Sequence, residues 1–277
     1  MRLKSVGRLR LLLGALALCL GLCSPAAAAK GDLTVLVNRQ TVSAWADGDG
    51  LVYVELEDFC QAASGQARVT ERGDAVTLEL PDRSITAQVG QQYFFADGRY
   101  YFCGVTGAVQ SRYGKLYVPL EPLAELFLAV VEEGDCKITV QTAEQTQSLT
   151  TTGTQRQDEE LYWLSRIISA EARGESLNGK IAVGNVVLNR VASDLFPDTV
   201  YDVIFDTAYG VQFSPVANGS VYDEPTEESV LAARLVLDGA EVTDEALYFE
   251  NEAIAASSWV SRNREELFVL GNHTFYA

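Results

Sequence analysis

The fold of the C-terminal half is decided by residues 161–175, which read LYWLSRIISAEARGE. A helix turns by about 100° per residue, so positions spaced by three, four and three residues share one side of it. Four residues have this spacing and lie within an arc of about 80°: Leu161, Leu164, Ile168 and Glu171. The sequence therefore predicts a helix, beginning at Asp158, whose buried face ends in a carboxylate.

Glu171 is the leading candidate for a catalytic residue. Apolar neighbours disfavour the charged form of a carboxyl group, and the negative end of a helix adds to this effect, so both raise its pKa. A glutamic acid that keeps its proton near neutral pH can act as a general acid. Glu175 lies on the same face, but Gly174 is expected to end the helix before it. We therefore expect Glu175 to have a structural part, pairing with Arg173 or with a backbone amide.

Beyond this helix, the apolar period predicts a mainly helical half with a little sheet. Residues 181–191 form an apolar helix interrupted by Asn189 and Arg190, which need partners if they are buried. A further helix opens at Thr226 and carries three apolar residues on one side: Val230, Ala233 and Leu237. Two short segments are typical of strands: residues 247–249 and 268–270.

The N-terminal half, residues 31–142, is typical of a β-rich unit built from an internal repeat. Residues 52–57 (VYVELE) resemble residues 116–121 (LYVPLE), and the two copies are offset by 64 positions. Each copy is followed by a short amphipathic helix, a Gly-Asp turn and a last strand. Two such copies predict one compact, duplicated α+β module.

The same half contains a predicted hairpin over residues 92–103, where Asp97-Gly98 suits a tight turn. Aromatic residues occupy both sides of this turn: Tyr93, Phe94, Phe95, Tyr100, Tyr101 and Phe102. At hairpin spacing alternate members must face a core. Core packing is therefore favoured over a platform for sugar rings.

Two segments are typical of processing and connecting sequence. Residues 1–29 combine a basic stretch, a short apolar run and several alanines. This pattern predicts a signal peptide cleaved after Ala29, so we expect a secreted protein without stable membrane insertion. Residues 143–157 are rich in Thr and Gln and predict a polar linker. The expected architecture is therefore α+β with two domains, residues 31–142 and residues 158–277.

Composition excludes several classes of function. The 277 residues carry a net charge of −17, which repels phosphate backbones, so we expect no nucleic-acid partner. His273 is the single histidine, which rules out a multi-histidine zinc or copper site, and we expect no metal or cofactor. Three cysteines follow the predicted cleavage point: Cys60, Cys103 and Cys136. Their odd number leaves at least one thiol free or paired between molecules, and buried small hydrophobes are expected.

Several uncommon pieces of the C-terminal half follow one another in a recognisable order. They are EARGE at 171–175, GKIAVGNVVLNRV at 179–191, FPDTV at 196–200, QFSP at 212–215, ALYF at 246–249, SWV at 258–260 and GNHTFY at 271–276. This order, over residues 160–277, resembles the SleB-type spore cortex-lytic family of cell-wall hydrolases. One departure lies at residues 249–252 (FENE), where relatives usually place an aromatic residue and a proline around the asparagine.

The resemblance implies a mainly α, lysozyme-like catalytic domain that acts on peptidoglycan or spore cortex glycan. It implies a lytic transglycosylase that cuts between N-acetylmuramic acid and N-acetylglucosamine, with cortex lysis during germination as one expected role, and it assigns catalysis to Glu171. The N-terminal half resembles the copper amine oxidase N-terminal-like domain. That likeness implies an accessory, wall-associated module, and this half has no histidine to bind copper.

Gln212, Tyr248 and Asn251 are candidates for substrate contacts, because amides and a phenol can bind N-acetyl and hydroxyl groups. His273 is interpreted as a hydrogen-bonded core histidine; if it lines the cleft, it would orient the substrate or Glu171. Two alternatives stay open. One is a wall- or spore-layer-binding protein without turnover. The other is a muramidase-type hydrolase, which needs a second carboxylate, and the sequence offers four: Asp198, Asp202, Glu250 and Glu252.

Overall fold

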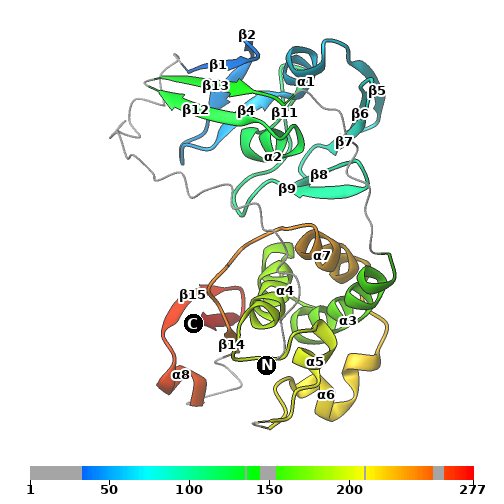
Figure 1. Ribbon diagram of the computed structural model, residues 1–277, viewed down its shortest axis with the longest axis vertical. Coiled ribbons are helices and arrows are strands. Elements are labelled where there is room, and N and C mark those ends of the chain that lie inside the picture. The colour runs from blue at the N-terminus through cyan, green and yellow to red at the C-terminus, as the bar shows by residue number, and fades with distance from the viewer. Residues whose placement is uncertain (1–32, 135, 144–153, 209, 252–258) are drawn as a thin grey trace, which may run out of the picture.

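The structure is a computed structural model (Figure 1), and it describes residues 33–134, 136–143, 154–208, 210–251 and 259–277. The predicted signal peptide and most of the predicted linker lie outside these ranges. The described part combines helices with four β-sheets, in agreement with the predicted α+β class. Within these ranges, no helix has the length and apolar character that crossing a bilayer requires.

The N-terminal part, residues 33–143, holds three of the sheets described. The first has the order β12-β13-β1-β2, the second β10-β11-β4-β3, and the third is a meander of β5 to β9. The first sheet consists of β1 (Thr34–Val37), β2 (Gln40–Val42), β12 (Val130–Gly134) and β13 (Lys137–Gln141). The second consists of β3 (Ala44–Ala46), β4 (Val52–Glu55), β10 (Gln110–Arg112) and β11 (Lys115–Pro119). The third consists of β5 (Arg68–Arg72), β6 (Ala75–Glu79), β7 (Ser84–Gln88), β8 (Tyr93–Ala96) and β9 (Arg99–Phe102).

The repeated sequence forms repeated elements. Strand β4 leads into helix α1 (Leu56–Ser64), and β11 leads into helix α2 (Leu120–Leu126), so the helices begin 64 residues apart. The two strands pair antiparallel with Val54 opposite Val118, its counterpart in the other copy. The copies are therefore related by an approximate twofold axis through this pair.

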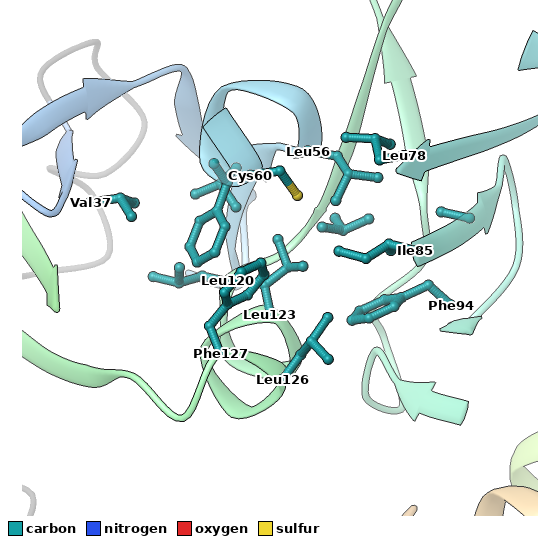
Figure 2. Packing of buried hydrophobic residues seen from close by; sticks show 14 of the residues in the cluster. Val37, Leu56, Cys60, Leu78, Ile85, Phe94, Leu120, Leu123, Leu126 and Phe127 are labelled. Carbon is teal, nitrogen blue, oxygen red and sulfur yellow. The ribbon is translucent and has the colours of Figure 1, made fainter. Parts of the chain in front are cut away.

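Both helices direct their apolar faces into one core (Figure 2). Phe59 of α1 contacts Phe127 after α2, with ring centroids 5.4 Å apart. Leu56 and Leu123 are buried between the sheets. The Glu55 carboxylate caps α1 by accepting from the amides of its second and third residues.

The predicted hairpin is present, and its aromatic residues face two ways. Asp97 and Gly98 both have positive φ, as a two-residue hairpin turn requires. Phe94 and Tyr101 stack in the N-terminal core, which confirms the predicted core packing. Their neighbours on the other face pack against the hydrophobic core of the C-terminal part: Tyr93, Tyr100 and Phe102.

The C-terminal part, residues 154–277, is mainly helical, with one small sheet of order β14-β16-β15. Its helices are α3 (Thr154–Ala172), α4 (Leu177–Ala192), α5 (Val200–Ile204), α6 (Ser214–Asn218), the 3-10 turn η1 (Ser220–Tyr222), α7 (Glu227–Leu237) and α8 (Trp259–Asn263). Its strands are β14 (Tyr248–Glu250), β15 (Glu266–Leu270) and β16 (His273–Tyr276). Helices α3, α4 and α7 lie together (Figure 1) and enclose the core.

Two predictions for these helices need correction. Helix α3 begins at Thr154, four residues before the predicted start, because Gln and Arg are good helix formers that need no burial to extend it. Helix α7 begins after its cap Thr226 as predicted, but its buried face is turned. Val230 and Leu237 are only half-buried, whereas five other residues of α7 are buried: Ser229, Ala232, Ala233, Leu235 and Val236.

The two parts touch through the β8–β9 hairpin, which lies directly above α7 in Figure 1. The Asp238 carboxylate, just after α7, accepts a hydrogen bond of 2.9 Å from the Tyr100 amide. The Arg99 guanidinium donates to the Asp238 carbonyl oxygen at 2.6 Å. At a second point, the Asn178 side chain donates to the Val105 carbonyl at 3.0 Å. A cavity of about 380 Å³ lies beside these contacts, lined by both parts.

Cys60 and Cys103 are buried free thiols, as expected of small hydrophobes. Burial raises the pKa of each thiol to about 12. Cys136 is exposed and also free. None of the three forms a disulfide within the described ranges.

Replacing the acid that joins the two parts should loosen their contact. We expect Asp238→Ala to speed hydrogen exchange at the Tyr100 amide at least about tenfold, because this half-buried N–H loses its acceptor at a cost of about 1–3 kcal/mol. Amide exchange read by NMR measures this change. Asp244→Ala, at an exposed acid nearby in the sequence, is the matched control. Equal protection of Tyr100 in the two variants would show that Asp238 does not hold the contact.

Candidate functional site

Glu171 lies in the last turn of α3, where the sequence predicts it. Its side chain is half-buried, and Ile168, one turn earlier, is completely buried. Burial raises the pKa of the Glu171 carboxyl to about 7, from an ordinary value of 4.5. A carboxyl group with this pKa carries its proton in a large fraction of molecules at neutral pH, so it can donate that proton to a substrate.

Helices α4 and α7 fix the end of α3 that carries Glu171. Ser169, two residues before it, accepts a hydrogen bond of 3.2 Å from the Thr226 amide at the start of α7. Gly184 of α4 lies so close to Ile168 and Val236 that a Cβ atom there would lie about 3 Å from both side chains. The glycine thus permits close packing of the three helices beneath the site.

Glu175 has the structural part that the sequence predicts, with a partner that the sequence does not identify. Its carboxylate accepts two hydrogen bonds from Asn272, one from the side-chain amide at 2.8 Å and one from the backbone amide at 3.2 Å. The predicted backbone-amide interaction is therefore confirmed. Pairing with Arg173 is wrong, because the Arg173 guanidinium extends to the carbonyl oxygen of Glu224 at 3.3 Å.

Lys180 is a structural residue of the site that the sequence analysis missed. Its side chain is almost completely buried within α4 and forms a salt bridge of 2.8 Å with Glu228 of α7. It also donates to the backbone carbonyl of Glu175. The sequence signal for this role was a lysine directly before the apolar run of α4. A lysine buried at that position needs acceptors close by for its ammonium group.

His273 begins β16 and is buried against Phe249, with ring centroids 5.2 Å apart. The prediction of a core histidine is confirmed. The predicted hydrogen bond is wrong for Nδ1, which is buried and finds no partner in the part of the chain described. Burial lowers the pKa of His273, while the nearby Glu175 carboxylate opposes that shift. The imidazole is thus held neutral near pH 7.

Tyr248 opens β14 and contacts two arginine side chains. The Arg264 guanidinium donates to the Tyr248 hydroxyl at 2.8 Å and lies 4.6 Å from the ring centroid. The Arg190 guanidinium lies 5.3 Å from the centroid of the same ring and also contacts Phe196 and Phe213. The phenol is therefore fixed in orientation, and the sequence analysis identified neither arginine as its neighbour.

Asn189 and Arg190, the polar pair within α4, both donate to backbone carbonyl groups, although Arg190 Nη1 is buried without a hydrogen-bond partner in the part of the chain described. Asn189 donates to the carbonyl oxygens of Thr243 and Ala246, and Arg190 Nε donates to that of Leu247 at 2.7 Å. Burial lowers the pKa of Arg190 to about 10. These bonds tie the segment before β14 to the central helix.

The other predicted contact residues, Asn251 and Gln212, lie after β14 and in the loop before α6. Asn251 directly follows β14, and the adjoining residues 252–258 are outside the described part. Gln212 donates to the carbonyl of Gly210 at 3.0 Å, so its amide is engaged within its own loop. The structure shows no contact that brings Gln212 or Tyr248 together with Glu171.

The candidate second carboxylates have other roles or lie at the surface. Glu250 is buried and accepts a hydrogen bond of 3.2 Å from the Tyr276 hydroxyl. Asp202 accepts from the hydroxyl of Thr199, the cap of α5, at 2.7 Å. Asp198 is exposed, and Glu252 is outside the described part. Among described residues, no group of three or more His, Cys, Asp or Glu could hold a metal ion.

Comparisons with known proteins concern the C-terminal part. A family model described as Cell Wall Hydrolase matches residues 174–276, which begin three residues after Glu171. The spore cortex-lytic enzyme of Bacillus subtilis is 37% identical over 112 residues, 40% of this chain and 35% of that protein. The enzyme of the same name from Oceanobacillus iheyensis is 36% identical over 116 residues, 42% of this chain and 41% of that protein.

Two solved structures also match. The catalytic domain of the germination-specific lytic transglycosylase SleB from Bacillus anthracis is 32% identical, with a TM-score of 0.40, and the match covers 47% of this chain and 100% of that domain. The catalytic domain of the Bacillus cereus SleB protein is 30% identical, also with a TM-score of 0.40, and covers 49% and 100%. The chain spans about two fifths of the length of the curated relatives it matches. The C-terminal part of this chain is therefore similar to the Cell Wall Hydrolase family over residues 174–276 and to spore cortex-lytic enzymes.

Proposed function

We propose that this chain is an exported enzyme that cleaves the glycan strands of peptidoglycan, with Glu171 as its catalytic acid and base. The observation that carries the proposal is the half-buried Glu171 carboxyl at the end of α3, whose pKa burial raises to about 7. The family match and the spore cortex-lytic relatives support a peptidoglycan substrate. The bond cleaved is that between N-acetylmuramic acid and N-acetylglucosamine.

Glu171 first donates its proton to the glycosidic oxygen as the bond to C1 of the muramic residue breaks. Its carboxylate then accepts a proton from the C6 hydroxyl of the same sugar, whose oxygen attacks C1 and closes a 1,6-anhydro ring. The proton lost in the first step returns in the second, so Glu171 ends as it began. This lytic transglycosylase route needs a single protein carboxylate, because the sugar supplies the nucleophile.

Hydrolysis would need a second carboxylate beside Glu171. Glu250 is buried and accepts a hydrogen bond from Tyr276, which makes it a poor candidate to activate a water molecule, whereas Asp198 and Asp202 are exposed. A muramidase-type hydrolase is the alternative, and analysis of the products distinguishes the two enzymes. Asn251 and His273 are proposed to bind or orient the substrate, as are Tyr248 and Gln212 at more remote subsites.

The remaining organisation is part of the same proposal. Two separate hydrophobic cores support a two-domain chain, with an accessory module over residues 31–142 and a lysozyme-like catalytic domain over 158–277. The basic and apolar segment at residues 1–29 supports export. The names of the relatives support action on spore cortex. The net negative charge of the chain disfavours binding to nucleic acid.

Replacing the proposed acid should abolish cleavage without unfolding the protein. We expect Glu171→Gln to slow the release of soluble fragments from purified peptidoglycan or cortex at least about 100-fold. The fold should persist, because a neutral amide of nearly the same shape replaces a carboxyl that is neutral in a large fraction of molecules at pH 7. Glu159→Gln, at an exposed acid of the same helix, is the matched control. A Glu171→Gln variant with the wild-type rate would remove Glu171 as the catalyst.

The products separate the two enzymatic routes. We expect mass spectrometry of the soluble fragments to find 1,6-anhydromuramic ends, because no water enters the proposed reaction. Two substrates are digested in parallel to identify the preferred one. The first is spore cortex, which contains muramic δ-lactam, and the second is vegetative sacculi. Fragments with reducing muramic ends would instead indicate a hydrolase.

The rate should depend on pH through the proton on Glu171. The donor form is retained below a pH of about 7 and is lost as the pH rises through the pKa of about 7. We therefore expect kcat/KM on soluble glycan fragments to fall about tenfold for each pH unit well above 7. A profile that stays flat to pH 9 would contradict a donor with this pKa.

A further inference from the structure

The segment that follows Glu171 is short and tightly held. Residues 173–176 connect α3 to α4, so their path fixes where the last turn of α3 ends. The Glu175 amide donates to the Ala172 carbonyl at 3.0 Å. Lys180, paired with Glu228 of α7, donates to the Glu175 carbonyl. The connection is therefore bound to both neighbouring helices through its backbone.

The Glu175 side chain adds a contact to the small sheet. Both its carboxylate oxygens accept hydrogen bonds from Asn272 in the β15–β16 turn, at 2.8 Å from the side chain and 3.2 Å from the backbone. Asn272 directly precedes His273, which is buried in the sheet. One side chain thus joins the end of the helix that carries Glu171 to the strand that carries His273.

The turn is shaped to receive this carboxylate. Gly271 has φ of +62°, and a Cβ atom there would collide with Glu175 Oε2. Most glycines of positive φ in the described part have open space at the same position, Gly219 and Gly239 among them. Absence of a side chain at residue 271 therefore gives the Glu175 carboxylate access to the backbone of the turn.

The charge of Glu175 suits this contact. Burial by itself would raise its pKa, but the two Asn272 hydrogen bonds, with His273 and Lys180 nearby, bring the pKa of Glu175 below its usual value. Glu175 thus stays ionised while Glu171, one turn earlier, keeps its proton. Ionised acceptors form shorter and stronger hydrogen bonds than neutral ones, which suits a fixed contact.

We propose that Glu175 is a positioning residue for the reaction, which through Asn272 fixes the β15–β16 turn against the connection after Glu171. This proposal rests on the proposed function of Glu171. The contact holds the end of α3 in place and keeps water away from the Glu171 carboxyl. It also sets the position of His273 relative to that carboxyl.

Breaking the contact should slow cleavage and change its pH dependence. We expect Glu175→Met, which cannot accept a hydrogen bond, to lower kcat on peptidoglycan fragments at least tenfold while KM stays within about twofold. We expect the fall in rate at high pH to begin at least half a unit lower, because water reaches Glu171. Asn272→Asp, which sets two carboxylates against each other, should act in the same way. Glu245→Met, at an exposed acid, is the control for the substitution itself.

A double variant tests the contact rather than either residue. In Glu175→Gln with Asn272→Asp, the new amide donates to the new carboxylate, and the backbone amide of residue 272 still has an acceptor. We expect this variant to regain most of the rate and pH profile lost in Asn272→Asp. Glu175→Gln alone should also retain most activity, because the Asn272 amide can rotate to accept from the new donor. Wild-type kinetics in Glu175→Met, or a double variant as slow as Asn272→Asp, would overturn the proposal.

Failure of the proposed function gives a different result. Wild-type protein that releases no more fragments than Glu171→Gln would remove the enzyme activity itself. The positioning of Glu171 is then judged by NMR titration of its carboxyl in wild type and Glu175→Met. A lower pKa in the variant supports the proposal, and an unchanged pKa overturns it.

Discussion

The structure depends on keeping one carboxyl group out of water at the end of a helix. Glu171 gains its raised pKa from burial, with no charged partner needed to explain it. That burial is costly for an ionised group, so the protein stabilises the neutral form instead. The close packing of α3 with α4 and α7, and the capped start of α7 at Thr226, provide the rigid support that this environment needs. The raised pKa of Glu171 is therefore a property of the helical core beneath it.

The pKa of a second carboxylate, that of Glu175 four residues later, is shifted in the opposite direction. Glu175 meets two hydrogen-bond donors from Asn272 and stays ionised, whereas Glu171 has burial alone acting on its pKa. Pairs of acids with opposite environments allow one group to transfer protons while the other holds structure. The N-terminal part contacts the same helical core through the β8–β9 hairpin and Asp238, and through Val105 and Asn178 near the start of α4, whereas the Glu175 side chain itself bonds to the small sheet.

The local sequence pattern was enough to predict the raised pKa of Glu171, because the 3.6-residue apolar period and the acid on its apolar face both lie within one helix. The Asp97-Gly98 turn and the cap at Thr226 were predictable for the same reason. Asn272 was not, since 97 residues separate it from Glu175 and only the folded chain brings them together. The buried face of α7 was not predictable either, because apolar residues lie on more than one side of this helix and its contacts with α3 and α4 select which of them are buried. Likewise, the outer aromatic face of the hairpin carried no local sign that it packs on the other part.

The most direct test of the account is a titration of the Glu171 carboxyl. Carbon-13 NMR of protein labelled at glutamate side chains follows each carboxyl with pH, and the resonance missing in Glu171→Gln identifies the group. The account predicts a midpoint near pH 7 for this resonance in the free protein. A midpoint near 4.5, the ordinary value for glutamate, would contradict it, because the group would then be ionised and unable to donate a proton at neutral pH.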